Sequence, residues 1–337
     1  MNSTRALTML TAFTLGVGSV PSPATAATGQ CRLPAGVLQS TALEAKSVAE
    51  CGAVGRLMDA GDGVALPVQE PGGSVTMDLL FPDGARTYSL TTDEQGRVST
   101  TKRPTMPPEH FQDLPGPGAC ERDSYQLRPY KWDKPWLFRT TKGTALATHR
   151  QSDFDAAARR ATANMTQGRN TCGMSGRTHA RGAFIGHTAK QGNFVYADGQ
   201  TTCGESDGHN VIDTGDLPGG FLEATLAWTC TWAETRHGVT RAVSADIRMN
   251  NADYNWTYRP GDDPACDPAF PPDPQRWRYD VESVLTHEIG HVYGLVNLSA
   301  PEDLNQTMYP GIRRCSGHMR TLGRGDVLGM RALYGPR

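Results

Sequence analysis

Two stretches of the chain repeat apolar residues at helical spacing. The first opens at Ser152–Asp155, which has the spacing of a capping box, and continues through Phe154, Ala157, Ala158, Ala161 and Met165. The second follows Asp280, a good N-cap residue, and runs through Val281, Val284 and Leu285 to His291, with Gly294 as a stop. These patterns predict two helices, each packing one face inward.

Short runs rich in β-branched and aromatic residues predict strands. They lie at 75–81, followed by turn residues at 82–85, and at 136–141, 183–186, 193–196, 224–228 and 245–249. Strands combined with a middle helix and a late helix indicate an α+β or α/β domain. No internal repeat of about 20 to 50 residues is present in the sequence, which argues against solenoids and propellers.

Composition divides the chain into four parts. Residues 1–26 are typical of an export signal, with Arg5 as the only charge, an apolar stretch and a small-x-small cleavage site at Ala24–Ala26. Residues 27–102 form a small β-rich region, and its role as pro-segment, adaptor or accessory domain stays open. The proline and glycine of residues 103–118 predict a linker. Residues 119–337 then form the main domain.

Charge and cysteine content limit the possible partners and the compartment. The chain has 33 Lys+Arg and 35 Asp+Glu, a net charge of −2, and no basic run that could neutralise nucleic-acid phosphates. No apolar window is long enough for a membrane anchor, and we expect a monomer. All 8 cysteines follow residue 26, and none forms a Cys-x-x-Cys pair. We therefore expect disulfides, with pairing left open, in a secreted, extracellular protein.

The stretch His287-Glu288-Ile289-Gly290-His291 carries the clearest chemistry. On a helix, two histidines four residues apart share one face and can bind a single zinc ion. Glu288 can then take a proton from the attacking water and pass it to the leaving amine. This spacing indicates amide hydrolysis.

The residues around this stretch resemble those of a known family. The run from His287 to Asn297 resembles the metzincin pattern H-E-x-x-H-x-x-G-x-x-H, and Thr307–Pro310 resembles the Met-turn of its matrixin branch. The ending 326–335 is similar to the C-terminal helix of matrixins. The resemblance implies an α+β metzincin-like domain, a twisted sheet with an active-site helix and a C-terminal helix. It also implies that Met308 lies beneath the zinc and that Tyr309 and Pro310 border the substrate pocket.

The sequence departs from the family at the third zinc ligand. Asn297 stands where the family has His or Asp, and a neutral amide is a weaker zinc donor. Three interpretations stay open: Asn297 ligates weakly, Asp303 or His318 replaces it, or the site has lost its metal. The Pro-Arg-Cys-Gly type of switch found in matrixin pro-segments is not present in the sequence.

These observations predict a secreted zinc-dependent endopeptidase that binds an extended polypeptide along a sheet edge. The alternative is a catalytically weak or inactive exported binding protein that retains the fold. Three aspartates in a glycine-rich stretch, Asp207, Asp213 and Asp216, could additionally bind calcium.

Overall fold

The computed structural model describes residues 31–44, 46–106, 118–146, 149–197, 199–217, 224–267 and 278–337. Residues Arg32–Arg337 form one compact unit, and the description below concerns that unit. The predicted export signal, residues 1–26, and most of the predicted linker lie outside the described residues. No described helix is both long and apolar enough to cross a membrane.

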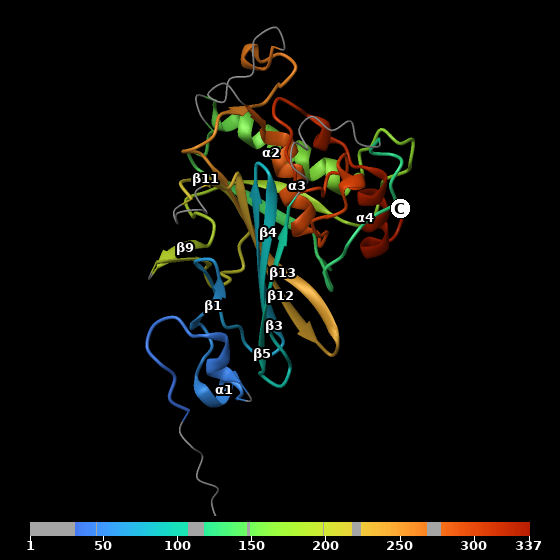
Figure 1. The fold of residues 1–337 in the computed structure, drawn as a ribbon. Coiled ribbons are helices and arrows are strands. Elements are labelled where there is room, and N and C mark those ends of the chain that lie inside the picture. The colour runs from blue at the N-terminus through green and yellow to red at the C-terminus, as the bar shows by residue number, and fades with distance from the viewer. Residues whose placement is uncertain are drawn as a thin grey trace, which may run out of the picture. The chain divides into compact units, whose positions relative to one another are not determined.

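A nine-stranded mixed sheet organises the unit. In spatial order its strands are β5 (Val98–Thr105), β4 (Gly84–Thr92), β3 (Gly73–Phe81), β12 (Ala227–Arg236), β13 (Val239–Asn250), β11 (Val211–Gly215), β7 (Trp136–Thr141) and β8 (Gly182–Thr188), while β6 (Tyr130–Lys131) pairs with β13. Strands β8, β7, β11 and β13 run parallel, and β12 is antiparallel to β13. Strands β3, β4 and β5 continue the sheet as antiparallel neighbours beyond β12 (Figure 1).

The remaining strands form two smaller sheets. One has the order β1 (Leu57–Gly61), β2 (Val64–Pro67), β10 (Gln200–Cys203) and β9 (Phe194–Ala197). The other pairs β14 (Trp256–Thr257) with β15 (Tyr279–Asp280). Because β2 pairs with β10 at Val64 and Thr201, the N-terminal strands contact the later chain here as well.

Alternating side chains of the large sheet supply two cores. Ala227 and Leu80 belong to the core that contains the main helices. On the other face, Trp228, Cys230 and Trp232 of β12 share a core with N-terminal residues such as Met77. A strand buried on both faces contributes to both cores, so β3 and β12 are central elements of the fold.

Three long helices pack in the first core. They are α2 (Gln151–Thr166), α3 (Val281–Val292) and α4 (Arg324–Tyr334), while α1 (Val48–Cys51) is a single turn near the N-terminus. Helix α3 begins as predicted, because the Asp280 carboxylate accepts a hydrogen bond from Ser283 N at 2.9 Å. Helix α2 begins earlier than predicted. Its N-cap is Arg150, so Ser152 lies inside the helix, and Asp153 accepts from Arg150 N.

Three disulfides staple the later part of the chain. They join Cys120 to Cys172, Cys203 to Cys230 and Cys266 to Cys315. No cysteine in the described part of the chain is free. Each of these bridges closes a loop within residues 118–337, where it reduces the conformational entropy of the unfolded chain.

The N-terminal region is β-rich, as the sequence predicts, but its strands pair directly with β12. Strand β5 ends at Thr105, so residues 103–105 belong to the sheet and the predicted linker is wrong for them. The sequence did not predict this, because pairing between strands that are far apart in the chain leaves no pattern in the residues nearby. The domain bounds themselves stay a prediction.

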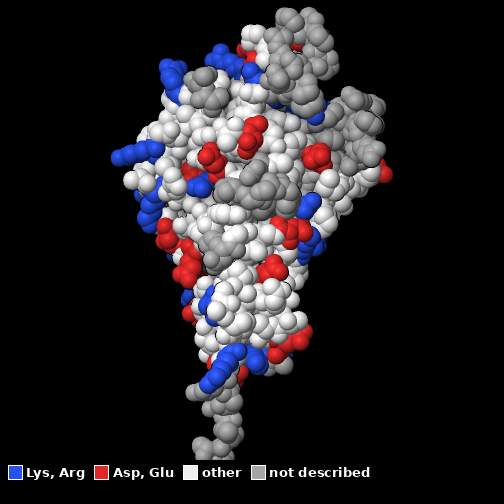
Figure 2. Space-filling view, turned by 60° about the vertical axis from the view of Figure 1, so that its left-hand side comes forward, with Lys and Arg blue, Asp and Glu red and all other residues white. Residues whose placement is uncertain are grey.

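Acidic and basic side chains are interspersed over the described part of the face shown in Figure 2. This distribution fits the balanced count of charged residues in the sequence. The predicted monomeric state stays a prediction.

Replacing Asp280 tests how α3 is held. Its carboxylate caps the helix and also accepts two hydrogen bonds from Arg320, at 2.7 and 2.6 Å, while it is fully buried. Asp280→Ala removes the cap and both hydrogen bonds that Arg320 donates to the carboxylate, and leaves Arg320 with Tyr258 O as an acceptor, so we expect a loss of about 3 kcal/mol in the free energy of unfolding. Urea unfolding measures this loss.

Asp263→Ala is the matched control. Asp263 caps a short helix through Ala265 N at 2.9 Å, and Arg278 Nε lies 4.0 Å from its Oδ2. We expect a loss of about 1 kcal/mol or less. Equal losses in the two variants would contradict the importance of the Asp280–Arg320 pair.

Candidate metal centre

Helix α3 places His287 and His291 side by side. Four residues separate them, so they share one face, and their ring centroids are 4.9 Å apart with the planes at 85°. Both side chains are buried, as is every residue of α3. The structure thus brings together the two histidines that the sequence singled out.

Backbone carbonyls fix the orientation of both imidazoles. His287 Nδ1 lies 2.8 Å from Thr307 O, and His291 Nδ1 lies 3.0 Å from Leu295 O. Because a carbonyl oxygen only accepts, each Nδ1 is the donor and each Nε2 keeps its lone pair. His287 Nε2 is buried and has no hydrogen-bond partner within the described residues. This is the arrangement in which histidines bind a metal.

Burial keeps the imidazoles neutral. It lowers the pKa of His287 to about 3, with a further contribution from neighbouring His291, and it also lowers the pKa of His291. The neutral imidazole is the form that ligates a metal, so little proton release is needed at neutral pH.

Glu288 lies beside this pair and is held by strand β12. Its Oε2 accepts a hydrogen bond from Thr229 Oγ1 at 2.5 Å, while Oε1 has no partner in the described structure. Burial raises the pKa of Glu288 to about 8, although the Thr229 hydrogen bond acts in the opposite direction. One carboxylate oxygen is therefore fixed and the other is available for a proton.

Asn297 reaches the same pair of histidines. The helix ends where Gly294 adopts a φ of 96°, and the chain then returns so that Leu298 N donates to Met308 O at 2.9 Å. The Asn297 side chain is buried and lies close enough to both imidazoles to raise their pKa values. Neither of its amide atoms has a hydrogen-bond partner among the described residues.

The two alternative ligands, Asp303 and His318, have contacts with residues other than the histidine pair. Asp303 Oδ1 lies 3.6 Å from Arg122 Nε, and its charge also acts on Tyr309. His318 Nδ1 lies 3.0 Å from Ser316 Oγ, and burial lowers the pKa of His318 to about 4. Asp303 Oδ1 and His318 Nε2 also lack a hydrogen-bond partner among the described residues, so the preference for Asn297 rests on its action on both imidazoles.

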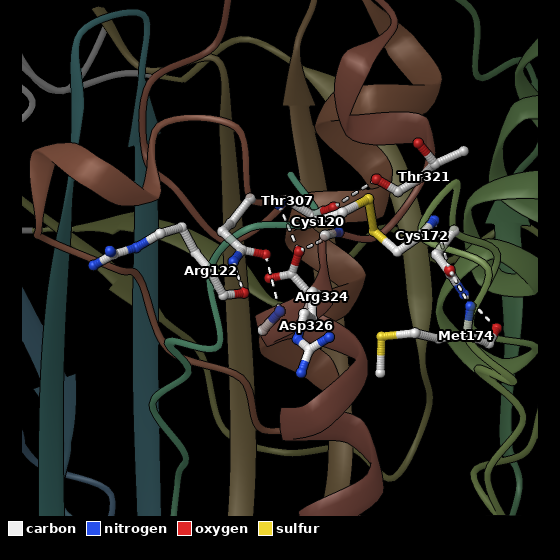
Figure 3. The surroundings of a disulfide bond; sticks show 12 residues. Cys120, Arg122, Cys172, Met174, Thr307, Thr321, Arg324 and Asp326 are labelled. Atoms are coloured by element: carbon white, nitrogen blue, oxygen red, sulfur yellow. Dashed lines mark hydrogen bonds between the residues drawn. A yellow bond between two sulfur atoms is a disulfide. The ribbon is translucent and has the colours of Figure 1, made fainter. Parts of the chain in front are cut away.

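The predicted Met-turn packs under α3. Met308 is buried, and a Cβ placed on Gly290 would lie 2.3 Å from its sulfur, so the helix and the turn approach closely. Asp326, in the first turn of α4, accepts a hydrogen bond from Thr307 N at 2.7 Å (Figure 3). It also accepts one from Met308 N at 3.1 Å. Tyr309 and Pro310 are also buried.

Sequence reasoning missed three carboxylate or hydroxyl groups around the centre: Thr229, Asp78 and Asp326. Thr229 follows directly after a predicted strand, and no sequence pattern marked it as a functional residue. Asp78 did carry one, because an aspartate in the middle of an apolar strand is uncommon and indicates a specific partner. Asp78 Oδ2 lies 4.0 Å from His291 Nδ1.

The three aspartates considered for calcium do not gather in one group. Asp207 accepts from Lys190 Nζ at 2.9 Å, and Asp213 forms hydrogen bonds of 2.8 and 2.6 Å with Arg248. Asp216 is exposed. Paired with cations, Asp207 and Asp213 have little charge left for a calcium ion.

The donor atoms at the centre fit zinc. Two neutral imidazoles and an amide side chain are buried next to one another, and both His287 and Asn297 carry unpartnered polar atoms. Zinc binds nitrogen and oxygen donors and leaves one position open in catalytic sites. Over the described ranges, no three His, Cys, Asp or Glu side chains come together as a metal-holding group, because the third position here is an amide.

Comparison with known proteins agrees with this geometry. Residues 224–335 match the family model of the matrixins, the Peptidase_M10 family. The matched segment begins just before β12 and includes α3, the Met-turn and α4. No curated protein is similar enough to the chain to count as a match. Residues 224–335 are thus a matrixin-like segment, similar to the zinc metallopeptidase domains of the metzincin type.

Proposed function

We propose that the protein is a secreted zinc-dependent endopeptidase whose catalytic domain spans residues 119–337. The observation that carries the proposal is the pair of neutral imidazoles with backbone-held Nδ1 atoms next to a carboxylate held by Thr229. The matrixin match supports zinc and peptide hydrolysis in general. Disulfides in the described part of the chain, together with the signal-like residues 1–26, support export.

His287, His291 and Asn297 would hold the zinc ion. Bound there, zinc would polarise the scissile carbonyl and lower the pKa of the attacking water. Glu288 Oε1 then takes the proton of that water and delivers it to the leaving nitrogen, while Thr229 keeps Oε2 fixed. Burial raises the pKa of Glu288, which makes its carboxylate a stronger base for that proton.

The remaining site residues have supporting roles. Met308 packs beneath the histidines and contacts α3 at Gly290. Tyr309 and Pro310, which follow Met308 directly, would border the pocket for the residue after the scissile bond. The substrate would be a polypeptide bound in extended form.

One observation favours a second function. Asn297 brings no charge to the zinc, and a weak third ligand lowers metal affinity. An exported binding protein that retains the fold but cleaves slowly or not at all is therefore the alternative. The presence of Glu288 argues against it, because a binding protein needs no proton shuttle.

Substitution of Glu288 tests catalysis. Glu288→Gln keeps the shape of the side chain but removes the base, so kcat for peptide hydrolysis by the zinc-loaded chain should fall about 10²- to 10⁴-fold. A zinc chelator should abolish the hydrolysis. Glu282→Gln is the control on the same helix, where the carboxylate accepts from Arg160 Nε at 2.6 Å, away from the imidazoles. Its kcat should stay within a few-fold of the unaltered chain; equal losses would contradict the role of Glu288.

Zinc affinity tests the third ligand. Asn297→Ala should weaken zinc binding by at least about tenfold, and Asn297→His should strengthen it, because imidazole is a better donor than an amide. Competition against a chromophoric chelator measures both changes. Asp303→Ala and His318→Ala should leave the affinity unchanged. A loss confined to either of these two variants would transfer the role of ligand to that residue.

A double-mutant cycle tests the contact beneath the centre. Gly290→Ala forces its new methyl group against Met308 Sδ, and overpacking of this kind costs about 1–3 kcal/mol of the free energy of unfolding. In a Met308→Ala background the clash is relieved, so the cost should be smaller by about 1 kcal/mol. Urea unfolding of the four proteins gives the coupling energy. Additive losses would mean that Met308 does not pack on α3 as described.

A further inference from the structure

Exposed basic side chains gather in the segment that leads into strand β8. Every second residue of this segment is exposed and basic: Arg177, His179 and Arg181. The residues between them, Thr178 and Ala180, are buried in the protein. The segment therefore anchors itself through alternate side chains and presents the basic ones to solvent.

Main-chain hydrogen bonds fix this segment at both ends. At its start, Arg177 O accepts a hydrogen bond from Arg337 N at 2.9 Å. At its end, Arg181 O accepts hydrogen bonds from Trp136 N at 2.9 Å and from the Tyr293 hydroxyl at 3.1 Å. The main chain therefore needs no ordering when a ligand binds to the side chains, which lowers the cost of binding.

Two cavities open on this segment and share Arg181. One has a volume of about 310 Å³, and Arg177 and Arg181 both line it. The other has a volume of about 480 Å³ and is lined by Arg181, His179 and Lys131 of strand β6. Because one arginine belongs to both, the two cavities adjoin and form one hollowed, basic surface.

The cations of these cavities are not neutralised by neighbouring carboxylates. Lys131, Arg177 and Arg181 form no ion pair with any described residue. Among the described lining residues of the two cavities, the one acidic side chain is Asp133, and it pairs with Arg241. The positive charge is thus available to a ligand.

Helix ends account for only part of this charge. Helix α2 ends at Thr166 and α4 at Tyr334, which line the cavities, and α3 ends at Val292, whose carbonyl accepts from Trp132 Nε1 in the second cavity. A helix C-terminus carries about −0.5 elementary charge, so three ends carry about −1.5 against three cations. Arg337, the last residue of the chain, also lines both cavities, and its two charges cancel. An excess positive charge of about +1.5 remains.

We propose that this basic surface, formed by Lys131, Arg177, His179 and Arg181, binds an acidic stretch of a polypeptide. The planar fork of an arginine side chain matches a carboxylate and binds it through two parallel hydrogen bonds. Two adjoining basic cavities suit a ligand with several carboxylates along one chain better than they suit a single small anion. Aspartate and glutamate side chains in an acidic stretch meet this requirement.

The number of cations favours a polypeptide over a nucleic acid or a sulfated polysaccharide. Those polymers carry charge along their whole length and bind through many phosphate or sulfate contacts. The chain as a whole has a net charge of −2, so it repels a long polyanion outside this surface. A short acidic stretch interacts with the basic surface alone.

The basic surface contacts the end of the helix that carries the candidate metal ligands. Tyr293, the first residue after α3, donates to Arg181 O, and Tyr334 of the second cavity donates to Tyr293 O at 3.0 Å. None of the described lining residues of the two cavities belongs to the candidate metal centre. The surface is therefore a separate site on the same packed unit. Its use in holding a substrate rests on the proposed peptidase function, whereas the binding itself does not.

Charge reversal tests the proposal in the full chain, with Glu288→Gln present to prevent hydrolysis. The probe is a fluorescent peptide of alternating glutamate and serine, and its affinity is measured by fluorescence anisotropy. Arg177→Glu combined with Arg181→Glu should weaken binding by at least about tenfold, because two attractions become repulsions. Raising the salt from about 0.1 to 1 M, which shortens the screening length from about 10 to 3 Å, should also weaken it. A peptide of alternating glutamine and serine should not bind.

Arg32→Glu combined with Arg259→Glu is the matched control. Both arginines are exposed and form no ion pair with a described residue, so this variant changes the net charge by the same amount. Its affinity for the glutamate peptide should stay within about twofold of the parent chain. Equal losses in the two double variants would mean that overall charge alone attracts the peptide, and would overturn the proposal. The same holds if charge reversal weakens the binding of dextran sulfate but not that of the peptide, because the ligand is then a sulfated polysaccharide.

Failure of the proposed function gives a different result. With Glu288 restored and zinc bound, charge reversal at Arg177 and Arg181 should raise KM for an acidic polypeptide relative to a neutral one. If the glutamate peptide binds as expected but the restored chain hydrolyses neither polypeptide, the basic surface stands and the peptidase function fails. If the restored chain hydrolyses both but charge reversal changes neither the affinity nor the ratio of KM values, the peptidase stands and the basic surface is contradicted.

Discussion

Burial of α3 on every side is the constraint on which the rest of the structure depends. A buried polar group must find a partner, and α3 carries several of them. The Thr307 carbonyl satisfies His287 and so fixes the Met-turn, while Thr229 satisfies Glu288 and so fixes β12. Arg160 of α2 reaches Glu282 in the same way. Each partner comes from a different element, so the helix determines where its neighbours lie.

Several atoms on and around this helix have no partner, and three groups among them are ones that the proposed chemistry needs. His287 Nε2, Glu288 Oε1 and the Asn297 amide are buried and unpartnered within the described residues, as are Asp78 Oδ2, Ser283 Oγ and the Tyr309 hydroxyl. A single buried polar atom without a partner destabilises the fold. Several such atoms lie together here, and both histidine Nδ1 atoms already bond a carbonyl, so a bound metal would supply the missing partner.

Local patterns predicted the parts of this centre that lie close together in sequence. The Asp280 cap, the helical spacing of His287 and His291 and the stop at Gly294 all follow from short-range rules, and the structure has each of them. Asp78 and Thr229 could not be placed in this way, because their meeting depends on the pairing of β3 with β12 across a long separation. For the same reason the sequence predicts a linker at residues 103–105, although these residues form the end of strand β5.

The pairing of β3 with β12 also bears on how a neutral third ligand is tolerated. A divalent ion held by two imidazoles and an amide would keep its full charge, and burial of an uncompensated charge is costly. Two buried carboxylates lie near the histidine pair: Glu288 follows His287 directly, and Asp78 Oδ2 lies 4.0 Å from His291 Nδ1. They would supply the counter-charge that the direct ligands lack. The weaker the contribution of Asn297 is, the more the binding of a metal would depend on Asp78, which the pairing of β3 with β12 brings to the centre.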